Sequence, residues 1–184
     1  MSQKLDNRKN VVIVGGGSTG LPIARSLSAK LDATKYNLIL VNARPYHIHM
    51  LAGARLTTSE EGNLEDLAFM PYDKVFINGN GSLKVGKVTG IDANSGAKGG
   101  VLTLANGEKL PYEILVLATG NIWNGAVAFP DDKDEVTEWI KQWRSKYKKA
   151  NHVVLAGGGA VGIETAGELK DQFPVGPFRL FILS

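Results

Sequence analysis

The chain has 184 residues, 43% of them hydrophobic, and a formal net charge of +3 at pH 7. This length can bury a sizeable core, and so small a positive excess gives no reason to expect a nucleic-acid partner. The sequence contains no cysteine, which excludes disulfides, thiolate metal sites and a redox-active dithiol. No apolar run approaches the ~20 residues that span a bilayer, so no transmembrane segment is expected.

The N-terminal residues are polar. Their sequence, MSQKLDNRKN, has no apolar stretch of the kind that secretory signals carry, and residues 1–9 are predicted to form a short polar tail. A chain without cysteine also agrees with a reducing compartment. We expect a cytoplasmic or other intracellular location rather than secretion.

The stretch Asn10–Leu27 carries the clearest motif in the chain. Val11–Val14 is a short β-branched run, typical of a buried parallel strand, and apolar residues at helical spacing follow further on. Between them Gly15, Gly17 and Gly20 form G-x-G-x-x-G, and strand, glycine turn and helix in this order predict a dinucleotide site. Gly15 would allow the tight turn, Gly17 the approach of a pyrophosphate, and Gly20 close helix–strand packing. The N-terminus of the helix that follows favours phosphate. The alternative is a glycine-rich turn that binds no ligand. A second copy of the motif downstream makes this alternative less favoured.

A second parallel strand is predicted over Asn37–Val41, and the residue after it bears on nucleotide choice. An acid commonly stands there and accepts hydrogen bonds from the adenosine ribose, but this chain has Asn42. Arg44 follows, and an arginine in this region can receive a 2′-phosphate or lie against the adenine face. The remaining alternative for Arg44 is a solvated loop residue.

The next segment, Pro45–Arg55, contains His47 and His49. In an extended segment these two side chains share one face, but a metal site needs further ligands and the chain has no cysteine. A loop beside a cofactor is the favoured interpretation, and no metal site is predicted.

The middle of the chain changes character. Thr57–Asp66 indicates a turn and a short helical piece, and Val75–Leu104 has short β-branched segments between glycine- and asparagine-rich turns. This pattern predicts an antiparallel excursion inserted into an α/β fold. Ile114–Ala118 then predicts another buried strand, ending in a small-residue turn that is well placed to touch a ligand.

A linker is expected over Asn121–Asp134, followed by an amphipathic helix over Glu135–Lys149. One apolar stripe contains Val136, Trp139, Ile140, Trp143 and Tyr147. The tryptophans are expected to pack rather than to form a stacking platform. The opposite face carries Lys141, Arg144, Lys148 and Lys149, and a solvated basic face is favoured there over a nucleic-acid or membrane surface.

The opening motif then returns. His152–Ala156 predicts a strand, a second G-x-G-x-x-G with Gly157, Gly159 and Gly162 follows, and Phe178–Leu183 predicts a further strand. The wide spacing of the two copies excludes a solenoid and suits two dinucleotide-binding units, the first of them carrying an insertion.

Four segments in this order carry a resemblance to a known family: VVIVGGGSTG at 11–20, RPYHIHMLAGARL at 44–56, LVLATG at 115–120 and HVVLAGGGAVGIETAGEL at 152–169. The chain resembles the N-terminal portion of the two-dinucleotide-binding flavoproteins of the pyridine nucleotide-disulfide oxidoreductase superfamily. Within them it is most similar to the apoptosis-inducing-factor-like and ferroptosis-suppressor-like NAD(P)H oxidoreductases.

The resemblance implies FAD at the first motif and NADH or NADPH at the second. The pyrophosphate of FAD would lie against Gly15, Gly17, Ser18, Thr19 and Gly20. Asn42 would face the adenosine ribose, Arg44 would flank it, and Val88 would contact the adenine through its backbone.

The remaining implied contacts lie further along the chain. Ala118, Thr119 and Gly120 would line the FAD site where the chain leaves for the second unit. Gly157, Gly159 and Gly162 would hold the pyrophosphate of NAD(P)H, and Glu164 would lie near its nicotinamide end.

The implied fold class is α/β. It comprises a Rossmann-like FAD-binding βαβ unit with an inserted antiparallel β excursion, followed by the start of a second, NAD(P)-binding unit. The predicted domains are an FAD-binding domain over 10–125, a linker and amphipathic helix over 126–150, and the beginning of a truncated NAD(P)-binding domain over 151–184.

The implied function is hydride transfer from NAD(P)H to FAD, with electrons passing to a quinone-like or other small-molecule acceptor. No side chain stands out as a general acid or base, so no catalytic residue is predicted. The alternative is a catalytically incomplete dinucleotide-binding or interaction module. The strand edge at Phe178–Leu183 would suit pairing with a complementing chain or with a second copy.

Overall fold

A computed structural model describes residues 7–93, 98–174 and 178–181. The chain divides into two compact units, one of Met1–His47 and Pro71–Asn121 and the other of Ile48–Met70 and Ile122–Ser184. Residues 48–70 group with the C-terminal part, so the first unit is not continuous in sequence. The predicted domain boundaries after residues 125 and 150 stay predictions.

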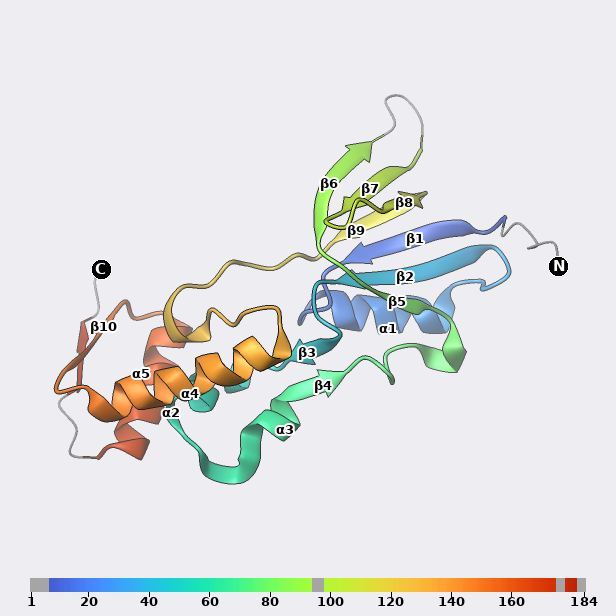
Figure 1. The fold of residues 1–184 in the computed structure, drawn as a ribbon. Coiled ribbons are helices and arrows are strands. Elements are labelled where there is room, and N and C mark those ends of the chain that lie inside the picture. Colours follow the sequence, from blue (N-terminus) through green and yellow to red (C-terminus); the bar gives the residue numbers. More distant parts are fainter. Residues whose placement is uncertain (1–6, 94–97, 175–177, 182–184) are drawn as a thin grey trace. The chain divides into compact units, whose positions relative to one another are not determined.

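The first unit is built on a parallel sheet of four strands in the order β5-β2-β1-β9 (Figure 1). The strands are β1 (Lys9–Val14), β2 (Tyr36–Asn42), β5 (Ser82–Val85) and β9 (Ile114–Leu117). In the register, Val11 lies opposite Leu38 on one side and Ile114 on the other. β1 is central and its four valine and isoleucine residues are buried, as parallel strands covered on both faces require.

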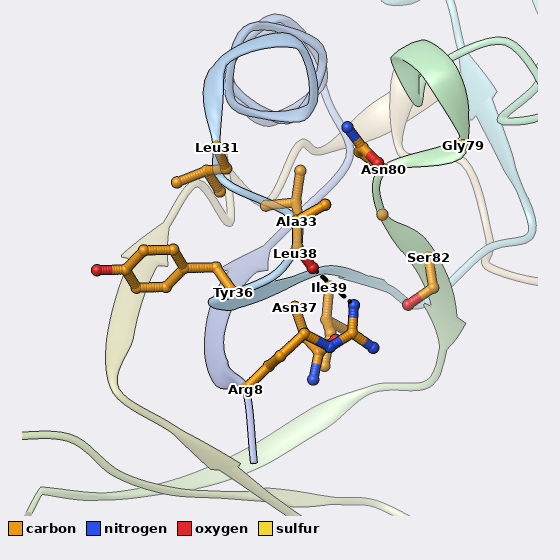
Figure 2. A pocket seen from close by; sticks show the side chains of 11 residues that line it. Arg8, Leu31, Ala33, Tyr36, Asn37, Leu38, Ile39, Gly79, Asn80 and Ser82 are labelled. Carbon is orange, nitrogen blue, oxygen red and sulfur yellow. Dashed lines mark hydrogen bonds between the residues drawn. The ribbon is translucent and has the colours of Figure 1, made fainter. Parts of the chain in front are cut away.

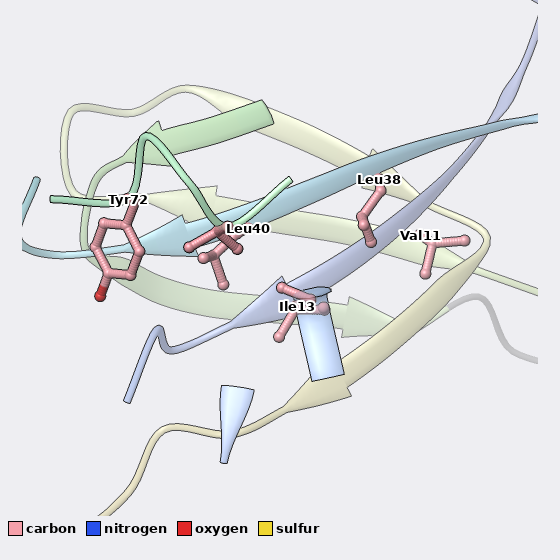
Figure 3. Packing of buried hydrophobic residues seen from close by; sticks show 7 residues of the cluster. Val11, Ile13, Leu38, Leu40 and Tyr72 are labelled. Atoms are coloured by element: carbon pink, nitrogen blue, oxygen red, sulfur yellow. The ribbon is translucent and has the colours of Figure 1, made fainter. Parts of the chain in front are cut away.

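One face of this sheet is covered by α1 (Gly20–Lys30). Buried side chains from β1, β2 and α1 form the core on this side together with Tyr72 and Val75, and Figure 3 shows Val11, Ile13, Leu38 and Leu40 within it. The helical spacing that predicted α1 places Ala24, fully buried, against the sheet.

The other face is covered by a separate antiparallel sheet of β6 (Val88–Ala93), β7 (Gly100–Leu104) and β8 (Lys109–Tyr112). Leu102 and Leu104 pack against Val12, Val14 and Val41. The α/β class with an inserted antiparallel excursion is therefore confirmed. The predicted excursion began too early, because β5 pairs in parallel with β2 and belongs to the main sheet, where Leu83 packs beneath α1.

The chain passes from the first unit to the second within β3 (Tyr46–Ile48) and returns within β4 (Phe69–Pro71). These two short strands pair with each other. Between these strands the chain forms η1 (Met50–Ala52), α2 (Gly53–Thr58), η2 (Glu61–Asn63) and α3 (Leu64–Ala68). The turn predicted within Thr57–Asp66 follows α2, and Gly62 and Asn63 in it both have positive φ. The short helical piece predicted there corresponds to the start of α3. A further turn, η3 (Ile77–Gly79), precedes β5.

The second unit contains η4 (Gly125–Val127), α4 (Lys133–Lys149), β10 (Val153–Ala156), α5 (Ala160–Gln172) and β11 (Phe178–Phe181). β10 and β11 are parallel and adjacent, which repeats the arrangement of β1 and β2. The end of the predicted strand Phe178–Leu183 lies outside the described residues, as do most of the predicted N-terminal tail and, at residues 94–97, part of one glycine- and asparagine-rich turn predicted within Val75–Leu104. Val127 and Phe129 are buried, so part of the expected linker belongs to the core of this unit.

The predicted amphipathic helix is present as α4, with Val136, Ile140 and Tyr147 buried. Trp139 and Trp143 are half-buried and their rings are 6.1 Å apart, so they pack as expected. Arg144 was predicted to lie on a solvated basic face, and this prediction is wrong. Its Nε donates to the carbonyl oxygen of Leu56 at 2.9 Å, and its Nη1 lies 2.7 Å from Glu65. Its long side chain reaches α2 and α3 within the unit instead of extending into water.

Arg55 ties α2 to α5 in the second unit. Its Nε lies 2.8 Å from Glu168 and its Nη2 lies 3.9 Å from Asp171, and the Glu168 carboxylate raises the pKa of the Arg55 guanidinium. Among the helices of the described residues, none is both long and apolar enough to cross a membrane.

Candidate dinucleotide-binding site

The first glycine motif forms a turn in which three elements meet. Gly15 has a φ of +100°, a conformation that side-chain-bearing residues rarely adopt. A Cβ at Gly15 would collide with the carbonyl oxygen of Ala118, and a Cβ at Gly20 would collide with the carbonyl oxygen of Gly15. Glycine is therefore required at both positions because β1, β9 and α1 approach closely here.

The two glycines between them differ sharply. Gly16 is buried, and a Cβ there would lie 2.7 Å from Cζ of Tyr72. Gly17 is exposed, and a Cβ there would have nothing within 4 Å. Gly17 is thus free of steric demands from the protein itself, which agrees with a position that a ligand approaches.

A cavity of about 490 Å³ opens at the carboxyl ends of β1 and β2. The predicted site residues in its wall are Gly15, Asn42, Val88 and Thr119. The other lining residues are Val14, Val41, Ala43, Gly86, Lys87, Thr89, Gly90, Ile91 and Leu117. Ligands of open parallel α/β sheets bind at this edge, so this cavity is the candidate site.

Asn42 holds the glycine turn as well as lining the cavity. Its Oδ1 accepts a hydrogen bond from the N–H of Gly16 at 2.9 Å, and its Nδ2 donates to the carbonyl oxygen of Arg44 at 2.9 Å. An amide oxygen has two lone pairs and an amide nitrogen two hydrogens, so Asn42 retains capacity for a ligand hydroxyl.

The charge in the cavity wall comes from a residue that the sequence analysis missed. Lys87 lines the cavity and no lining residue is acidic, whereas Arg44 is not part of the wall. The N–H of Gly86, next to Lys87, donates to the carbonyl oxygen of Asn42 at 2.8 Å, which brings Lys87 close to the end of β2. A lysine after a short edge strand carries no signal in the sequence that would mark it as a site residue.

The other residues predicted for the first site surround the turn. Ser18 and Thr19 are exposed just before α1, and Ala118 abuts Gly15 and Gly20. Gly120 is exposed with a φ of +71°. Contact of any of these residues with a nucleotide stays a prediction.

The second glycine motif reproduces the backbone of the first. Gly157 has a φ of +115°, and a Cβ at Gly162 would collide with the carbonyl oxygen of Gly157. Gly159 is exposed immediately before α5, and Glu164 is exposed on α5. The same sterics thus force the same turn twice, and nucleotide contacts at the second turn stay a prediction.

Two buried side chains beside the first turn were not predicted as site residues. The hydroxyl of Tyr72 donates to the carbonyl oxygen of Gly16 at 2.8 Å, and Nδ1 of His47 lies 3.1 Å from the same oxygen. Burial raises the pKa of the Tyr72 hydroxyl to about 12, so it is a donor at any ordinary pH. His49 is exposed, and the described residues contain no group of three or more histidine, cysteine, aspartate or glutamate side chains that could hold a metal.

A smaller hollow of about 260 Å³ lies elsewhere in the first unit (Figure 2). Tyr36, Asn37 and Ser82 line it, and Arg8 bridges its mouth by donating to the carbonyl oxygen of Ala33 at 3.1 Å. These residues stand at the amino ends of β2 and β5, away from the glycine turn, where ligands of parallel sheets do not normally bind.

Comparison with known proteins identifies the family. The family described as pyridine nucleotide-disulphide oxidoreductase matches residues 9–172. The chain belongs to this family. The predicted resemblance is therefore confirmed, and the missing cysteine means that the dithiol implied by the family's name is not in this sequence.

Several named proteins resemble the chain. The FAD-dependent oxidoreductase FVFD30 of Flammulina velutipes is 45% identical over 119 residues, which are 65% of this chain and 37% of that protein. Ferroptosis suppressor protein 1 of Mus musculus is 30% identical over 171 residues, 90% of this chain and 41% of that protein. The chain thus spans about two fifths of the length of these curated relatives.

The fold also matches solved structures. The sulfide:quinone oxidoreductase of Aquifex aeolicus superposes with a TM-score of 0.63 at 23% identity, covering 92% of this chain and 42% of that one. At this identity the likeness establishes the fold alone, and it supports the Rossmann-type parallel sheet described above.

Proposed function

We propose that this chain is the N-terminal part of an FAD-dependent NAD(P)H oxidoreductase, with FAD at the first glycine turn and NADH or NADPH at the second. The observation that carries the proposal is the exposed turn at Gly17 beside a cavity of about 490 Å³ at the carboxyl ends of β1 and β2. Membership of the family and the FAD-dependent relative support the choice of cofactors.

The residues present fit the adenosine half of a dinucleotide. The volume lies within the usual range for ligand cavities. Val14, Val41 and Leu117 supply apolar wall for a base, and Asn42 and Thr119 supply polar atoms for a ribose. The turn at Gly17 leaves room for a pyrophosphate to approach the backbone and the N-terminus of α1.

A bound flavin would supply the acceptance of hydride from a nicotinamide and the release of electrons to an acceptor. The chain's own residues would bind and orient the two nucleotides. The first turn would fix the flavin nucleotide and the second turn the nicotinamide nucleotide. A quinone-like acceptor, pairing with a second or complementing chain, and an intracellular location are the finer parts of the proposal and rest on the sequence.

The first experiment is an absorption spectrum of the purified chain, with and without added FAD, after gel filtration. We expect flavin bands that stay with the wild-type protein and are lost from Gly17→Val. A wild-type protein that excludes FAD while remaining folded would contradict the first site.

The second step separates the enzyme from a binding module. NADH or NADPH is added anaerobically to the FAD-loaded chain, and bleaching of the flavin band is followed. Bleaching supports the oxidoreductase. The same reaction is repeated with the relatives' C-terminal portion supplied in trans. If FAD stays bound and neither nucleotide bleaches the flavin band even then, the incomplete dinucleotide-binding module is favoured.

A further inference from the structure

Side chains hold both the N–H and the carbonyl oxygen of Gly16, which belong to two consecutive peptide units. The Gly16 N–H donates to Oδ1 of Asn42 at 2.9 Å, and the Gly16 carbonyl oxygen accepts from the Tyr72 hydroxyl at 2.8 Å. The same oxygen lies 3.1 Å from Nδ1 of His47. Because a carbonyl oxygen only accepts, the proton in this last contact belongs to Nδ1 of His47.

These hydrogen bonds occupy both lone pairs of the Gly16 oxygen in a buried environment. Tyr72 is 4% exposed and His47 is 8% exposed, so water does not compete readily for the same oxygen. Turning this carbonyl toward the cavity would leave two buried donors without an acceptor, which is costly. The Gly16 oxygen is therefore fixed toward the interior.

The direction of one carbonyl fixes the direction of the next N–H. The described residues contain no cis peptide bond, and in a trans peptide the C=O and the following N–H point in opposite directions. With the Gly16 oxygen fixed inward, the Gly17 N–H points outward, where Gly17 is exposed and its surroundings are open. No described residue accepts this N–H, so it is available to an anion.

We infer that His47 and Tyr72 are positioning residues that hold the Gly16–Gly17 peptide, while Asn42 anchors the preceding Gly15–Gly16 peptide, so that the Gly17 N–H faces the pyrophosphate of the nucleotide before it binds. The inference rests on the proposed function, since it assumes that a dinucleotide occupies the first turn. A flip of this peptide would present a carbonyl oxygen to the phosphates and repel them. A turn fixed beforehand avoids the cost of ordering it during binding.

The test compares two disruptive and two control variants in the full chain. Tyr72→Phe removes one hydroxyl, and His47→Leu removes the second donor. His47→Asn is the conservative variant because its amide can donate from near the Nδ1 position. Tyr147→Phe is the matched control, since Tyr147 is a buried tyrosine of the other unit.

We expect Tyr72→Phe to weaken FAD and ADP binding by about tenfold, the effect of one hydrogen bond. Tyr72→Phe combined with His47→Leu should weaken it further, whereas His47→Asn and Tyr147→Phe should stay close to wild type. The ³¹P NMR shift of the pyrophosphate in the bound nucleotide should change in Tyr72→Phe. A purely structural role for Tyr72 would leave that shift unchanged.

A measurement without ligand separates this inference from the proposed function. Amide hydrogen exchange is followed in ¹H–¹⁵N NMR spectra of the wild-type chain. The Gly17 amide, which points outward, should exchange rapidly, and the Gly16 amide, which donates to Asn42, should exchange slowly. Slow exchange of the Gly17 amide would overturn the outward direction of this N–H, whatever the chain binds. A fixed peptide whose disruption leaves FAD and ADP affinity unchanged would overturn its positioning role. Failure of the wild type to bind either nucleotide would overturn the proposed function, and the positioning role with it, while rapid Gly17 exchange would still support the outward direction of its N–H.

Discussion

At the scale of single residues, the first turn assigns different tasks to neighbouring glycines. Gly15 is needed for its positive φ and its approach to Ala118, whereas Gly17 meets no such demand from the protein. The motif G-x-G-x-x-G therefore combines positions that the fold requires with one position that is left open for a ligand. Substitutions can separate the two requirements.

Gly17→Val should abolish nucleotide binding and leave the fold intact. An added Cβ would have nothing within 4 Å, so the free energy of unfolding should change by less than about 0.5 kcal/mol. Gly15→Val, by contrast, should destabilise the first unit by at least about 2 kcal/mol, because a β-branched residue is strained at positive φ and also clashes. Denaturant unfolding followed by far-UV circular dichroism measures both effects. Equal destabilisation by the two substitutions would contradict the division of tasks.

At the scale of single elements, the clearest determinant of a boundary is the start of α4. Oδ1 of Asp132 accepts hydrogen bonds from the N–H groups of Asp134 and Glu135, at 2.9 and 3.2 Å. These bonds satisfy two donors that the first helical turn otherwise leaves without partners. The sequence predicted the helix from its apolar stripe but placed its start at Glu135, since the stripe begins at Val136.

Asp132→Ala should destabilise the second unit by about 1 kcal/mol, the usual effect of removing such a cap. Asp132→Asn is the control, because asparagine accepts the same bonds and should be close to neutral. The chain has three tryptophans, Trp123, Trp139 and Trp143, all in the second unit, so tryptophan fluorescence during denaturation reports on this unit alone. A destabilisation by Asp132→Asn as large as that by Asp132→Ala would indicate a role of the charge instead of the cap.

At the scale of the whole molecule, each unit has its own buried residues, and among them is a tyrosine whose ionisation burial disfavours. Burial raises the pKa of Tyr72 in the first unit to about 12 and raises that of Tyr147 in the second. A raised pKa in the folded state means that the folded chain keeps a proton which the unfolded chain releases. The resulting stability is complete below the unfolded pKa of about 10 and is lost as pH rises above it.

Wild-type protein should accordingly lose stability between about pH 10 and pH 12, and Tyr72→Phe should lessen this loss in the first unit. Denaturation at a series of alkaline pH values, followed by far-UV circular dichroism, measures the effect. Tryptophan fluorescence provides the control, since Tyr72→Phe should leave the alkaline behaviour of the second unit unchanged. Identical alkaline profiles for wild type and Tyr72→Phe would exclude Tyr72 as a source of the pH dependence.

Much of the fold could be predicted from the sequence because it depends on local patterns. Val11–Val14 and the glycine turn after it specify a parallel strand and a tight connection, and the same pattern at Gly157 specifies it again. β5 was assigned to the wrong sheet because Ser82–Val85 is a short edge strand whose pattern does not distinguish parallel from antiparallel pairing. Arg144 was misplaced because helical spacing gives the face of a residue and not the reach of its side chain.

By itself, the sequence determined the α/β class, the two glycine turns, the family and the absence of a dithiol. Only the tertiary structure decided what surrounds the first turn: Lys87 in the cavity wall, and three side chains on Gly16. Asn42, His47 and Tyr72 lie 26, 31 and 56 residues from Gly16 in the chain. Periodicity relates only residues that are near one another in sequence, whereas the packing of strands and loops brings these distant side chains to a single residue, Gly16.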